Sequence, residues 1–425
     1  MNNLAIVIYR NNLRIDDNYP LFHAVNSYDK VLALYSVEIL KGYTSFWFKR
    51  CEKFRKNFIF EALEDLRESL ENFGINLVVC KDIKSTLEKL SNNYNIKIFF
   101  EEEVGVYEKE FEQILKAYNH ESFFTQIMIE PFDFGYDKSF SAFRKKAEKS
   151  LIKEPIKAIK KVSTIKYNSI NIKKETINYP NENSIIIKGG EKEALKRLAL
   201  YEQFIHTYKS TRNEMSGLNN STKFSAYLSL GCISPRRVYH TLKAYEDKSY
   251  ASDSSYWIYF ELLWRDFFYL VMRSSENKLF LTQGLTQNNY KFNEDKSTLN
   301  DFFNANTKVD LIDASIKELK STGWLSNRNR QLVSNYFVKY LGQNWIYGAQ
   351  FFESYLLDYN PASNYGNWAY QASVGNDKQY RVFDINNQCQ LYNGDSYIKK
   401  WHESSQNSLD FETMIEKVKK EVFSI

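Results

Sequence analysis

The sequence predicts an α/β doubly wound parallel sheet in an amino-terminal domain, followed by an all-helical carboxyl-terminal domain. The 425 residues exceed the usual size of a single domain. The first third alternates short apolar, β-rich runs with amphipathic helical stretches, which is typical of βαβ units. After Gly190 the pattern is helical almost to the end of the chain. We therefore expect domains over residues 1–130 and 191–425, joined by a connector over residues 131–190.

Five apolar runs are the expected strands, over residues 4–9, 31–37, 75–80, 96–100 and 123–129. Helices are expected to begin near Asp17, at Thr44 or Ser45, and at Lys84 and Ser85, and Gly74 is placed to end the second helix. A doubly wound sheet binds ligands at the carboxyl ends of its strands. No GxGxxG follows the first strand and no P-loop motif occurs, so the sequence excludes a standard dinucleotide or P-loop site.

The stretch between the two domains is rich in lysine, as in residues 153–161. We interpret it as a long connector that lies over the surface. A disordered linker is the alternative, but the interspersed isoleucines and tyrosines favour a segment that packs. Beyond it we expect a helix over residues 191–208, a helix capped by Ser234 with Pro235 in its first turn, and breaks between later helices at Gly323, Gly342 and Gly348.

The composition is that of an ordinary soluble globular protein, with 43% hydrophobic and 26% charged residues. The 16% aromatic share is high, and aromatic side chains stack on bases and flat cofactors as well as filling cores. The formal charge of +5 permits nucleic-acid binding through a local patch without requiring it.

The cysteines and histidines carry no ligand pattern. The four cysteines are widely spaced without a CxxC pair and no secretory signal precedes them, so we expect unpaired thiols and a cytoplasmic location. The five histidines show no metal-ligand spacing, so no metal site is expected. No apolar run is long enough to span a bilayer, so membrane insertion is not expected.

Residues 356–368 set polar side chains at short spacing in an otherwise aromatic region. Asp358, Asn360 and Asn364 can donate or accept hydrogen bonds in one compact patch, and Trp368 follows Asn364 by one helical turn. This combination suits a buried polar aromatic cofactor. The alternative is a polar loop between two helices.

Three further segments of the helical part combine polar and aromatic side chains. Residues 208–213 and 221–225 bring hydroxyls and Lys223 to the start of a helix, which suits a diphosphate, although such residues are often only caps. Residues 256–268 place Glu261 and Trp264 on one helix face, where the alternative is a surface glutamate beside a core tryptophan. Residues 321–331 carry Trp324 and arginines, of which Arg330 could pair with Asp358; the alternative is a solvated face.

Together these segments resemble the photolyase and cryptochrome family, most closely its DASH-type cryptochromes. The resemblance covers nearly the whole chain and starts at residues 9–18, which are similar to the family's RxDLRxxDN motif. The most DASH-like motifs are Tyr-Lys-Ser-Thr-Arg-Asn at 208–213, Ser-Thr-Lys-Phe-Ser at 221–225, Glu-Leu-Leu-Trp-Arg-Asp at 261–266, Gly-Trp-Leu-Ser-Asn-Arg at 323–328 and Ser-Asn-Tyr-Gly-Asn-Trp at 363–368.

The resemblance implies that the helical domain binds FAD. Arg330, fixed by Asp358, would stabilise a reduced flavin anion, and Asn364 would face flavin N5. Asn360 departs from the aspartate usual in the family, so we expect a somewhat raised flavin reduction potential. The residues expected to hold FAD are Tyr208, Ser221, Thr222, Lys223, Phe224, Ser225, Glu261, Trp264, Asn327, Arg330, Asp358, Asn360 and Asn364.

The activity that the resemblance implies is light-dependent repair of cyclobutane pyrimidine dimers by electron transfer from excited FADH⁻. The dimer would enter a pocket over the adenine of FAD, preferentially from single-stranded DNA, because unstacking costs little there. Gln331 stands where bacterial dimer photolyases tend to have methionine, which makes the pocket more polar. The residues expected to contact the dimer are Glu261, Trp264, Trp324, Asn327, Gln331 and Tyr370, and Trp345 and Trp368 are the expected start of the electron relay to FAD.

Two further expectations concern the relay and an antenna pigment. The third relay position holds Phe302, which is far harder to oxidise than tryptophan, so either a tyrosine takes the outer step or photoreduction is slow.

Glu103 matches the carboxylate that holds 5,10-methenyltetrahydrofolate in folate-binding members; a solvated, inert acidic run is the alternative. DNA or RNA would be bound through phosphate contacts of Arg212 and Arg328, by a protein expected to be a monomer.

A blue-light receptor or regulatory flavoprotein that binds nucleic acid with little repair is the competing function. The residues of the lesion pocket and the shortness of the segment after Trp401, expected to be a terminal helix, favour repair, whereas Phe302 and Asn360 weaken that case. A flavin electron-transfer protein without a light role is disfavoured, because no reductant-binding motif is visible.

Overall fold

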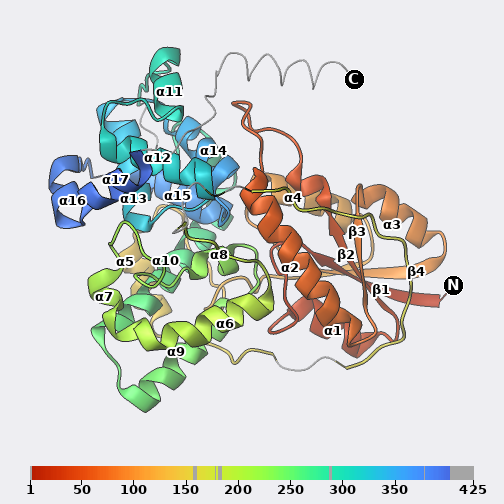
Figure 1. The fold of residues 1–425 in the computed structure, drawn as a ribbon. Coiled ribbons are helices and arrows are strands. Elements are labelled where there is room, and N and C mark those ends of the chain that lie inside the picture. The colour runs from red at the N-terminus through yellow and green to blue at the C-terminus, as the bar shows by residue number, and fades with distance from the viewer. Residues whose placement is uncertain are drawn as a thin grey trace.

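Two parts of different architecture make up the chain. The computed structural model describes residues 2–156, 160–177, 179, 184–286, 290–377 and 379–402. Figure 1 shows a sheet with its covering helices on one side of the molecule and a large assembly of helices on the other. All strands among the described residues lie between Asn2 and Phe123. The predicted fold class, an α/β domain followed by a helical domain, is confirmed.

The sheet has five parallel strands in the order β3-β2-β1-β4-β5. The order reverses at β1, which pairs with both β2 and β4, and such sheets bind ligands in the crevice beyond the carboxyl ends at this point. Four predicted strands are confirmed, with ends that differ by at most two residues. The strands are β1 (Asn2–Tyr9), β2 (Val31–Ser36), β3 (Asn76–Cys80), β4 (Tyr94–Glu101) and β5 (His120–Phe123).

The prediction of a strand over residues 123–129 is wrong, because β5 ends at Phe123. Beyond it the chain leaves the sheet for the helical domain. The backbone amides of Met128 and Ile129 donate to the carboxylate of Asp266, at 2.8 and 3.1 Å. The buried carboxylate of Asp266 therefore accepts from the backbone N–H groups that would otherwise pair with a neighbouring strand.

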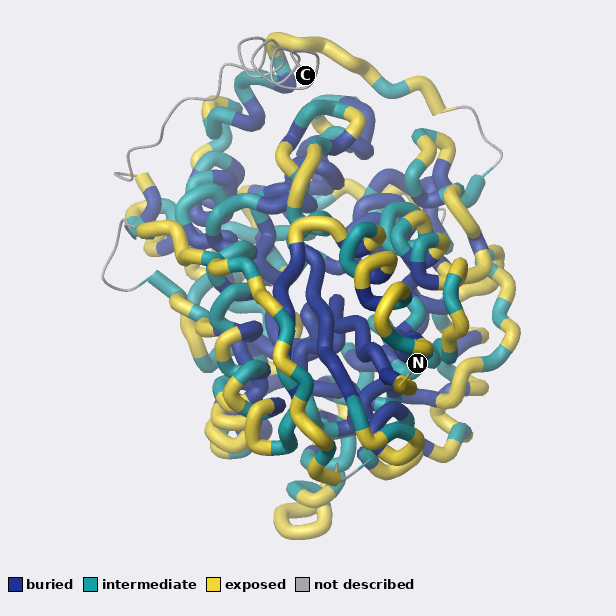
Figure 2. The backbone as a smooth tube through the Cα atoms, turned by 90° about the vertical axis from the view of Figure 1, so that its right-hand side faces the viewer, coloured by how far each residue is buried: buried dark blue, intermediate teal, exposed yellow. Residues whose placement is uncertain are grey.

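Both faces of the sheet are buried, and side chains alternate between them along each strand. Ala5 and Val7 of β1 face a core that is continuous with the helical domain, whereas Leu4 and Ile6 face a second, smaller core. Figure 2 shows the strands as the buried centre of this domain. The helices are α1 (Tyr19–Ser27) and α2 (Lys53–Glu71) on the first face and α3 (Ile83–Ser91) and α4 (Val106–Lys116) on the second.

The boundaries of three elements are close to the predicted ones. Asn18, one residue after the predicted Asp17, caps α1 by accepting from the backbone amide of Leu21 at 3.0 Å. Asp82 caps α3, two residues before the predicted position. Gly74, with a φ of +79°, lies just after α2 as expected.

The predicted start of α2 at Thr44 or Ser45 is wrong, because this helix begins at Lys53. A short 3-10 helix, η1 (Val37–Leu40), follows β2, and residues 41–52 then form a loop against the helical domain. The ring of Phe46 stacks on Tyr347 with centroids 3.6 Å apart. Contacts with a distant segment hold this loop, and no local sequence pattern reports them.

The connector packs on the surface, as expected, in its described residues. Ile170 donates its backbone amide to Val79 of β3 at 2.9 Å, so the connector runs along the edge of the sheet. It also contains α5 (Phe140–Ala147), a helix that the sequence analysis did not predict. Residues 157–159, 178 and 180–183 of the connector lie outside the described residues.

The helical domain begins with α6, which ends at Tyr201, earlier than predicted, and continues as a 3-10 helix. Ser234 caps α9 by accepting from Arg237 at 3.0 Å, as predicted, and Gly323 ends α12 with a φ of +71°. The elements are α6 (Glu191–Tyr201), η2 (Glu202–Thr207), α7 (Tyr208–Thr211), α8 (Phe224–Ser229), α9 (Pro235–Ser249), α10 (Asp253–Ser275), η3 (Lys278–Phe280), α11 (Lys296–Phe303), α12 (Asp310–Thr322), α13 (Asn327–Asn335), η4 (Tyr336–Tyr340), α14 (Trp345–Tyr355), α15 (Pro361–Gln371), α16 (Ile385–Leu391) and α17 (Gly394–His402).

The predicted helix break at Gly348 is wrong, and the predicted terminal helix lies mostly outside the described residues. Gly342, with a φ of +63°, separates η4 from α14 as expected, but Gly348 lies inside α14. The terminal helix expected after Trp401 falls mostly on residues 403–425, outside the described residues. No helix in the described part of the chain is long and apolar enough to cross a membrane.

Candidate functional site

Lys223 and Arg330 lie over the ring of Trp324, and Asp358 pairs with Arg330; we call these four residues the cation cluster. The ammonium of Lys223 lies 5.3 Å from the ring centroid and the guanidinium of Arg330 lies 5.2 Å from it. Arg330 donates to both carboxylate oxygens of Asp358, at 3.0 and 2.9 Å. The predicted pairing of Arg330 with Asp358 is confirmed, and three sequence motifs meet at one point.

Lys223 is buried without a carboxylate as its hydrogen-bond partner in the described part of the chain. It is 5% exposed, and its ammonium donates to Ser221 Oγ at 2.8 Å. Burial lowers the pKa of Lys223 to about 7. The carboxylates of Glu318 and Asp358 act on its charge but do not offset the cost of burial. A buried ammonium that donates to no carboxylate is costly, so this position suits an anionic ligand.

Arg197 of α6 binds the loop that carries Ser221, Thr222 and Lys223. This guanidinium donates to the backbone oxygens of Ser221 and Thr222 at 3.0 and 2.9 Å. Lys223 has a left-handed backbone with a φ of +58°, so the chain turns sharply before α8. At the start of α8, Phe224 is buried and Ser225 is exposed.

The start of α15 presents two amide side chains. Asn360 caps this helix by accepting from the backbone amide of Ser363 at 3.1 Å, and its amide nitrogen donates to the hydroxyl of Tyr269 at 2.6 Å. Asn364 donates to the backbone oxygen of Ala349 at 2.8 Å, whereas its buried Oδ1 accepts no hydrogen bond from any described residue. A buried acceptor without a donor suits a ligand N–H.

A second group of rings lies along α10 and the end of α15, and we call Phe140, Trp264 and Tyr370 the aromatic wall. Phe140 of α5 stacks on Trp264, with centroids 3.7 Å apart and planes at 4°. Tyr370 meets Trp264 edge-on at 6.2 Å. Phe140 was not among the predicted residues, and it comes from the connector. The wall offers flat apolar surface of the kind that binds bases.

Glu261 is already paired in the structure. Its carboxylate accepts from Arg212, and the guanidinium of Arg212 also lies 4.0 Å from the ring centroid of Trp257. The side chain of Glu261 is 37% exposed, so a carboxylate oxygen can still reach a ligand. Arg212 thus holds Glu261 in place beside the aromatic wall.

The other predicted residues of this region differ in exposure. Tyr208 is buried at the start of α7, close to Tyr201. Asn327, the first residue of α13, is exposed, and Gln331 on the same helix is partly exposed. Arg328 donates to Asn213 Oδ1 at 3.0 Å, so one of the two expected phosphate contacts is tied to a neighbouring loop.

Trp368 and Trp345 are both buried, at 2% and 0% exposure. The ring of Trp368 lies directly on Gly348, where an added Cβ would come within 2.1 Å of the ring. Gly348 is therefore required for a close approach between α14 and α15 rather than for a helix break.

Phe302 does not occupy a surface position. It is fully buried, and its ring neighbours are Phe303, Phe337 and Phe351. Among the described rings, Tyr365 contacts Trp345, at 6.4 Å. The hydroxyl of Tyr365 donates to Glu353 at 2.8 Å. A tyrosine with a carboxylate acceptor therefore stands next to the second predicted relay residue.

Glu103 lies just beyond β4, at the crevice where the strand order reverses. It is 3% exposed, so the alternative of a solvated acidic residue does not apply to it. One oxygen accepts from Asn11 at 3.0 Å and from Gln126 at 2.7 Å, and the other accepts from no described residue. Burial raises the pKa of Glu103 to about 8. Its role toward a folate stays a prediction.

The donors and acceptors of the helical domain fit FAD. The cation cluster offers a buried ammonium and a guanidinium for negative charge, and Asn364 offers an unused acceptor one turn into α15. When bound, FAD would supply the light absorption and the transferable electron.

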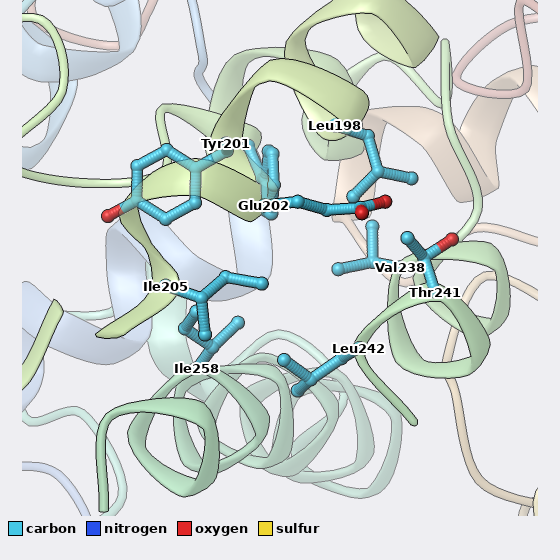
Figure 3. Close-up of a pocket in the computed structure, with 9 residues that line it drawn as sticks. Leu198, Tyr201, Glu202, Ile205, Val238, Thr241, Leu242 and Ile258 are labelled. Carbon is cyan, nitrogen blue, oxygen red and sulfur yellow. The ribbon is translucent and has the colours of Figure 1, made fainter. Parts of the chain in front are cut away.

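Two cavities lie away from these groups. The first, of about 10 Å³, is an apolar gap between α6, α9 and α10, shown in Figure 3, and holds one water at most. Its walls include Leu198, Val238 and Ile258. The second is an open groove of about 540 Å³ beside β3 and the connector. Of the predicted site residues, Phe224 lines the first cavity and none lines the second.

Comparison with known proteins matches both halves of the chain. Residues 5–160 match the family model described as DNA photolyase, and residues 257–421 match the FAD binding domain of DNA photolyase. Cryptochrome DASH of Gloeobacter violaceus is 35% identical over 93% of this chain and 85% of its own length. Cryptochrome DASH of Synechocystis sp. is 34% identical over 93% of this chain and 87% of its own.

Solved structures agree with these matches. A cryptochrome of Synechocystis sp. PCC6803 superposes with a TM-score of 0.88 at 33% identity and covers 94% of this chain and 88% of its own. A bacterial class III photolyase of Agrobacterium tumefaciens superposes with a TM-score of 0.81 at 22% identity, with coverages of 94% and 86%. The latter likeness concerns the fold alone.

Proposed function

The chain belongs to the photolyase and cryptochrome family, within its DASH cryptochromes, and carries the family's FAD-binding domain; from this premise we propose that it repairs cyclobutane pyrimidine dimers in single-stranded DNA with light. The observation that carries the proposal is that α15 packs against both α10, which bears Trp264 and Glu261, and α13, which bears Arg330 of the cation cluster. The cation cluster suits a reduced, negatively charged cofactor, and the aromatic wall with Glu261 suits two linked pyrimidines.

The residues have separate roles in this proposal. Lys223 and Arg330 neutralise the negative charge of FAD, and Asp358 keeps Arg330 in a fixed orientation. Asn364 accepts from a cofactor N–H through Oδ1. These side chains are held by hydrogen bonds to their own chain, so little reorganisation accompanies electron transfer.

The lesion is held on the exposed side of the same region. Trp264 and Tyr370 give two perpendicular ring surfaces, with Phe140 supporting Trp264 from one face. Glu261, oriented by Arg212, accepts from the edges of the flipped bases. Trp324, Asn327 and Gln331 complete the pocket, and Arg212 and Arg328 make it attractive to phosphate.

The proposal extends to organisation and antenna. Residues 1–130 form the antenna domain, 131–190 the connector and 191–425 the catalytic domain. Glu103 takes a folate by accepting from a pterin N–H through its free oxygen. A neutral donor ligand suits this position, because the carboxylates of Glu108 and Glu112 act on Glu103 and oppose a further negative charge.

The test is a repair assay with the reduced protein. Single-stranded and duplex oligonucleotides that carry one thymine dimer are incubated in light and in darkness, and the recovery of thymine absorbance is followed. We expect light-dependent recovery that is faster on the single strand. Absence of light-dependent recovery on both substrates would reject repair.

A blue-light receptor with little repair is the second candidate, and the pairing of Glu261 with Arg212 is the observation that favours it. If this pair persists when a dimer is present, the carboxylate is less free to bind the bases. The same assay separates the two functions, because a receptor would be photoreduced normally and still leave both oligonucleotides unrepaired.

A further inference from the structure

Four buried side chains form a continuous hydrogen-bonded chain between the two domains. Asn360 Nδ2 donates to the hydroxyl of Tyr269 at 2.6 Å, this hydroxyl donates to Gln126 Oε1 at 2.8 Å, and Gln126 Nε2 donates to Glu103 Oε1 at 2.7 Å. All four residues are between 0% and 6% exposed. They come from the amino-terminal cap of α15, from α10, from the loop after β5 and from the loop after β4. We call them the interdomain chain.

The direction of every bond in the interdomain chain is fixed by one backbone amide. Ser363 N–H must find an acceptor at the start of α15, and it uses Asn360 Oδ1 at 3.1 Å. The NH₂ group of Asn360 therefore faces Tyr269. The tyrosine hydroxyl accepts this bond, so its own proton goes to the amide oxygen of Gln126, and the NH₂ group of Gln126 is left to face Glu103.

The two ends of the interdomain chain lie at the two places where ligands are expected. Glu103 stands in the crevice of the sheet where the strand order reverses. Asn360 stands two residues after Asp358, which holds Arg330 in the cation cluster. The chain therefore spans the distance between the α/β crevice and the cofactor-facing loop.

We propose that Gln126 and Tyr269 are positioning residues that couple Glu103 to Asn360, so that protonation or ligand binding at Glu103 changes the hydrogen bonding of the flavin-facing loop. The proposal rests on the proposed function for the place of FAD. An ionised Glu103 accepts the NH₂ groups of Gln126 and Asn11 and matches the observed direction.

A Glu103 that carries its proton on Oε1, the oxygen that Gln126 and Asn11 contact, conflicts with that direction, whereas a proton on Oε2 leaves it unchanged. An O–H at Oε1 donates to Gln126, turns the amide round and points an N–H at Tyr269. The tyrosine hydroxyl then faces the NH₂ groups of both Gln126 and Asn360, and its proton has no acceptor within the interdomain chain. Restoring an acceptor would require Asn360 to turn, which would remove the cap from Ser363. The helix cap and the protonation of Glu103 on Oε1 are thus linked.

The groups around Glu103 tune this link without belonging to it. Arg10, which follows β1, and Glu108 and Glu112 of α4 act on its charge. Arg265 of α10 lies 4.5 Å from the ring centroid of Tyr269 and donates to the hydroxyl of this tyrosine at 3.4 Å. Arg10 favours the ionised carboxylate, whereas the two glutamates oppose it. Burial raises the pKa of Glu103 to about 8, so the carboxyl group titrates near that pH.

Replacement of Asn360 by aspartate would reverse the interdomain chain. An aspartate accepts from Ser363 N–H with one oxygen and from the hydroxyl of Tyr269 with the other. Gln126 Oε1 then loses its donor and can accept from a protonated Glu103. Asn360→Asp is therefore expected to increase the proton affinity of Glu103 about tenfold, or about one pH unit in its midpoint.

The experiment is a titration of the FAD-containing protein with two readouts. The infrared carboxyl band that Glu103→Gln removes reports the protonation of Glu103, and the visible flavin spectrum reports the loop. In the unchanged protein we expect both to titrate together. In Tyr269→Phe, which keeps the ring, we expect the carboxyl band to titrate and the flavin spectrum to stay constant with pH. Glu101→Gln, a buried carboxyl outside the chain, serves as the matched control.

Two results would overturn the coupling. One is a flavin spectrum that still follows Glu103 in Tyr269→Phe, and the other is an unchanged midpoint of Glu103 in Asn360→Asp. The infrared readout does not depend on repair. If Asn360→Asp shifts the midpoint of Glu103 but leaves the flavin spectrum unchanged, the interdomain chain exists and the proposed place of FAD is wrong. Melting curves of each variant confirm that it is folded before titration.

Discussion

The candidate ligand positions of the two domains differ in the charge that they bury: carboxylates at the edge of the sheet, and Lys223 and Arg330 in the cation cluster. At the carboxyl edge of the sheet, burial raises the pKa of Glu101 to about 7 and that of Glu103 to about 8. In the helical domain, burial lowers the pKa of Lys223 to about 7, and Arg330 lies beside it. Both regions are costly to form without ligands, but only the helical one attracts anions.

This difference assigns different ligands to the two domains. A diphosphate or a reduced flavin carries negative charge and gains from Lys223 and Arg330. The acidic edge would repel the same molecule and suits a neutral group that donates N–H bonds, as a pterin does. The interdomain chain joins the two regions through uncharged side chains, so it can transmit a change in hydrogen bonding without moving a charge across the core.

The largest effect is expected from Asp358→Asn, which tests whether pairing keeps the cation cluster in place. Asp358 has a fully buried carboxylate, and its loss leaves the guanidinium of Arg330 without its anion. We expect the unfolding free energy to fall by about 3 kcal/mol and FAD binding to weaken severely. Urea unfolding and titration of flavin fluorescence measure the two quantities.

The matched control is Asp377→Asn, which removes a more exposed partner of Arg381. This variant is expected to change the unfolding free energy by less than about 1 kcal/mol. If Asp358→Asn is no more destabilising than Asp377→Asn, the charge of the cation cluster is not held by pairing, and the contrast between the domains loses its basis.

The sequence predicted those parts of the fold that local patterns determine. Strands β1 to β4 follow from their apolar runs, and α1 and α3 follow from cap residues within two positions of the predicted ones. The fifth strand was misplaced because Asp266, more than a hundred residues away, takes its backbone donors. The start of α2 was misplaced because its loop packs on Tyr347. Such long-range contacts produce no periodic pattern in the local sequence.

The candidate site was predictable where several motifs carry unusual residues. The pairing of Arg330 with Asp358 and the meeting of Lys223 with Trp324 connect segments that sequence motifs had singled out. Phe140, Tyr269 and Gln126 were missed, because each is an ordinary residue in its own segment and acquires a role only from its tertiary neighbours. The carboxylate acceptor of Tyr365 was missed for the same reason.

Lys223→Met tests whether the buried ammonium of the cation cluster destabilises the protein without FAD and strengthens FAD binding. The folded pKa of about 7 lies below the ordinary value of 10.5, so the unfolded chain binds more protons between these values. The unchanged protein without FAD should therefore gain stability as pH rises from about 7 to 10.5, and Lys223→Met should lose this gain. The variant should be more stable at neutral pH without FAD and bind FAD about tenfold to a hundredfold more weakly.

Higher stability without FAD together with weaker FAD binding would distinguish a ligand site from ordinary packing. Lys209→Met, which removes an exposed lysine paired with Asp253, is the control and should change neither quantity appreciably. A Lys223→Met protein that is less stable without FAD would mean that the ammonium is well satisfied by its own chain.

Glu103→Gln tests the acidic edge by the pH dependence of stability. The folded pKa of about 8 lies above the ordinary 4.5, so the favourable contribution is complete below about pH 4.5 and is lost as pH rises to about 8. The variant should flatten this loss, by an amount on the order of a few kcal/mol. Denaturant unfolding at several pH values measures it. Glu110→Gln, on the exposed face of α4, should leave the slope unchanged.

The smallest effect on stability is expected from Tyr365→Phe, at the boundary between the two regions. Tyr365 contacts Trp345, and its hydroxyl donates to Glu353, whose other carboxylate oxygen lies 3.8 Å from Arg50 of the loop before α2. An oxidised tyrosine must release its proton, and Glu353 is placed to accept it. The variant should lose about 1 kcal/mol for the hydrogen bond and should reduce its bound FAD several-fold more slowly under blue light with an external reductant.

Phe302→Leu is the decisive control, because it alters the predicted relay position without touching the ring beside Trp345. If Tyr365→Phe is photoreduced at the normal rate while Phe302→Leu is slowed, the outer electron passes through the buried phenylalanines of the helical core. If only Tyr365→Phe is slowed, the electron enters through the interface, where Glu353 and Arg50 bring the carboxylate and the cation of opposite domains together.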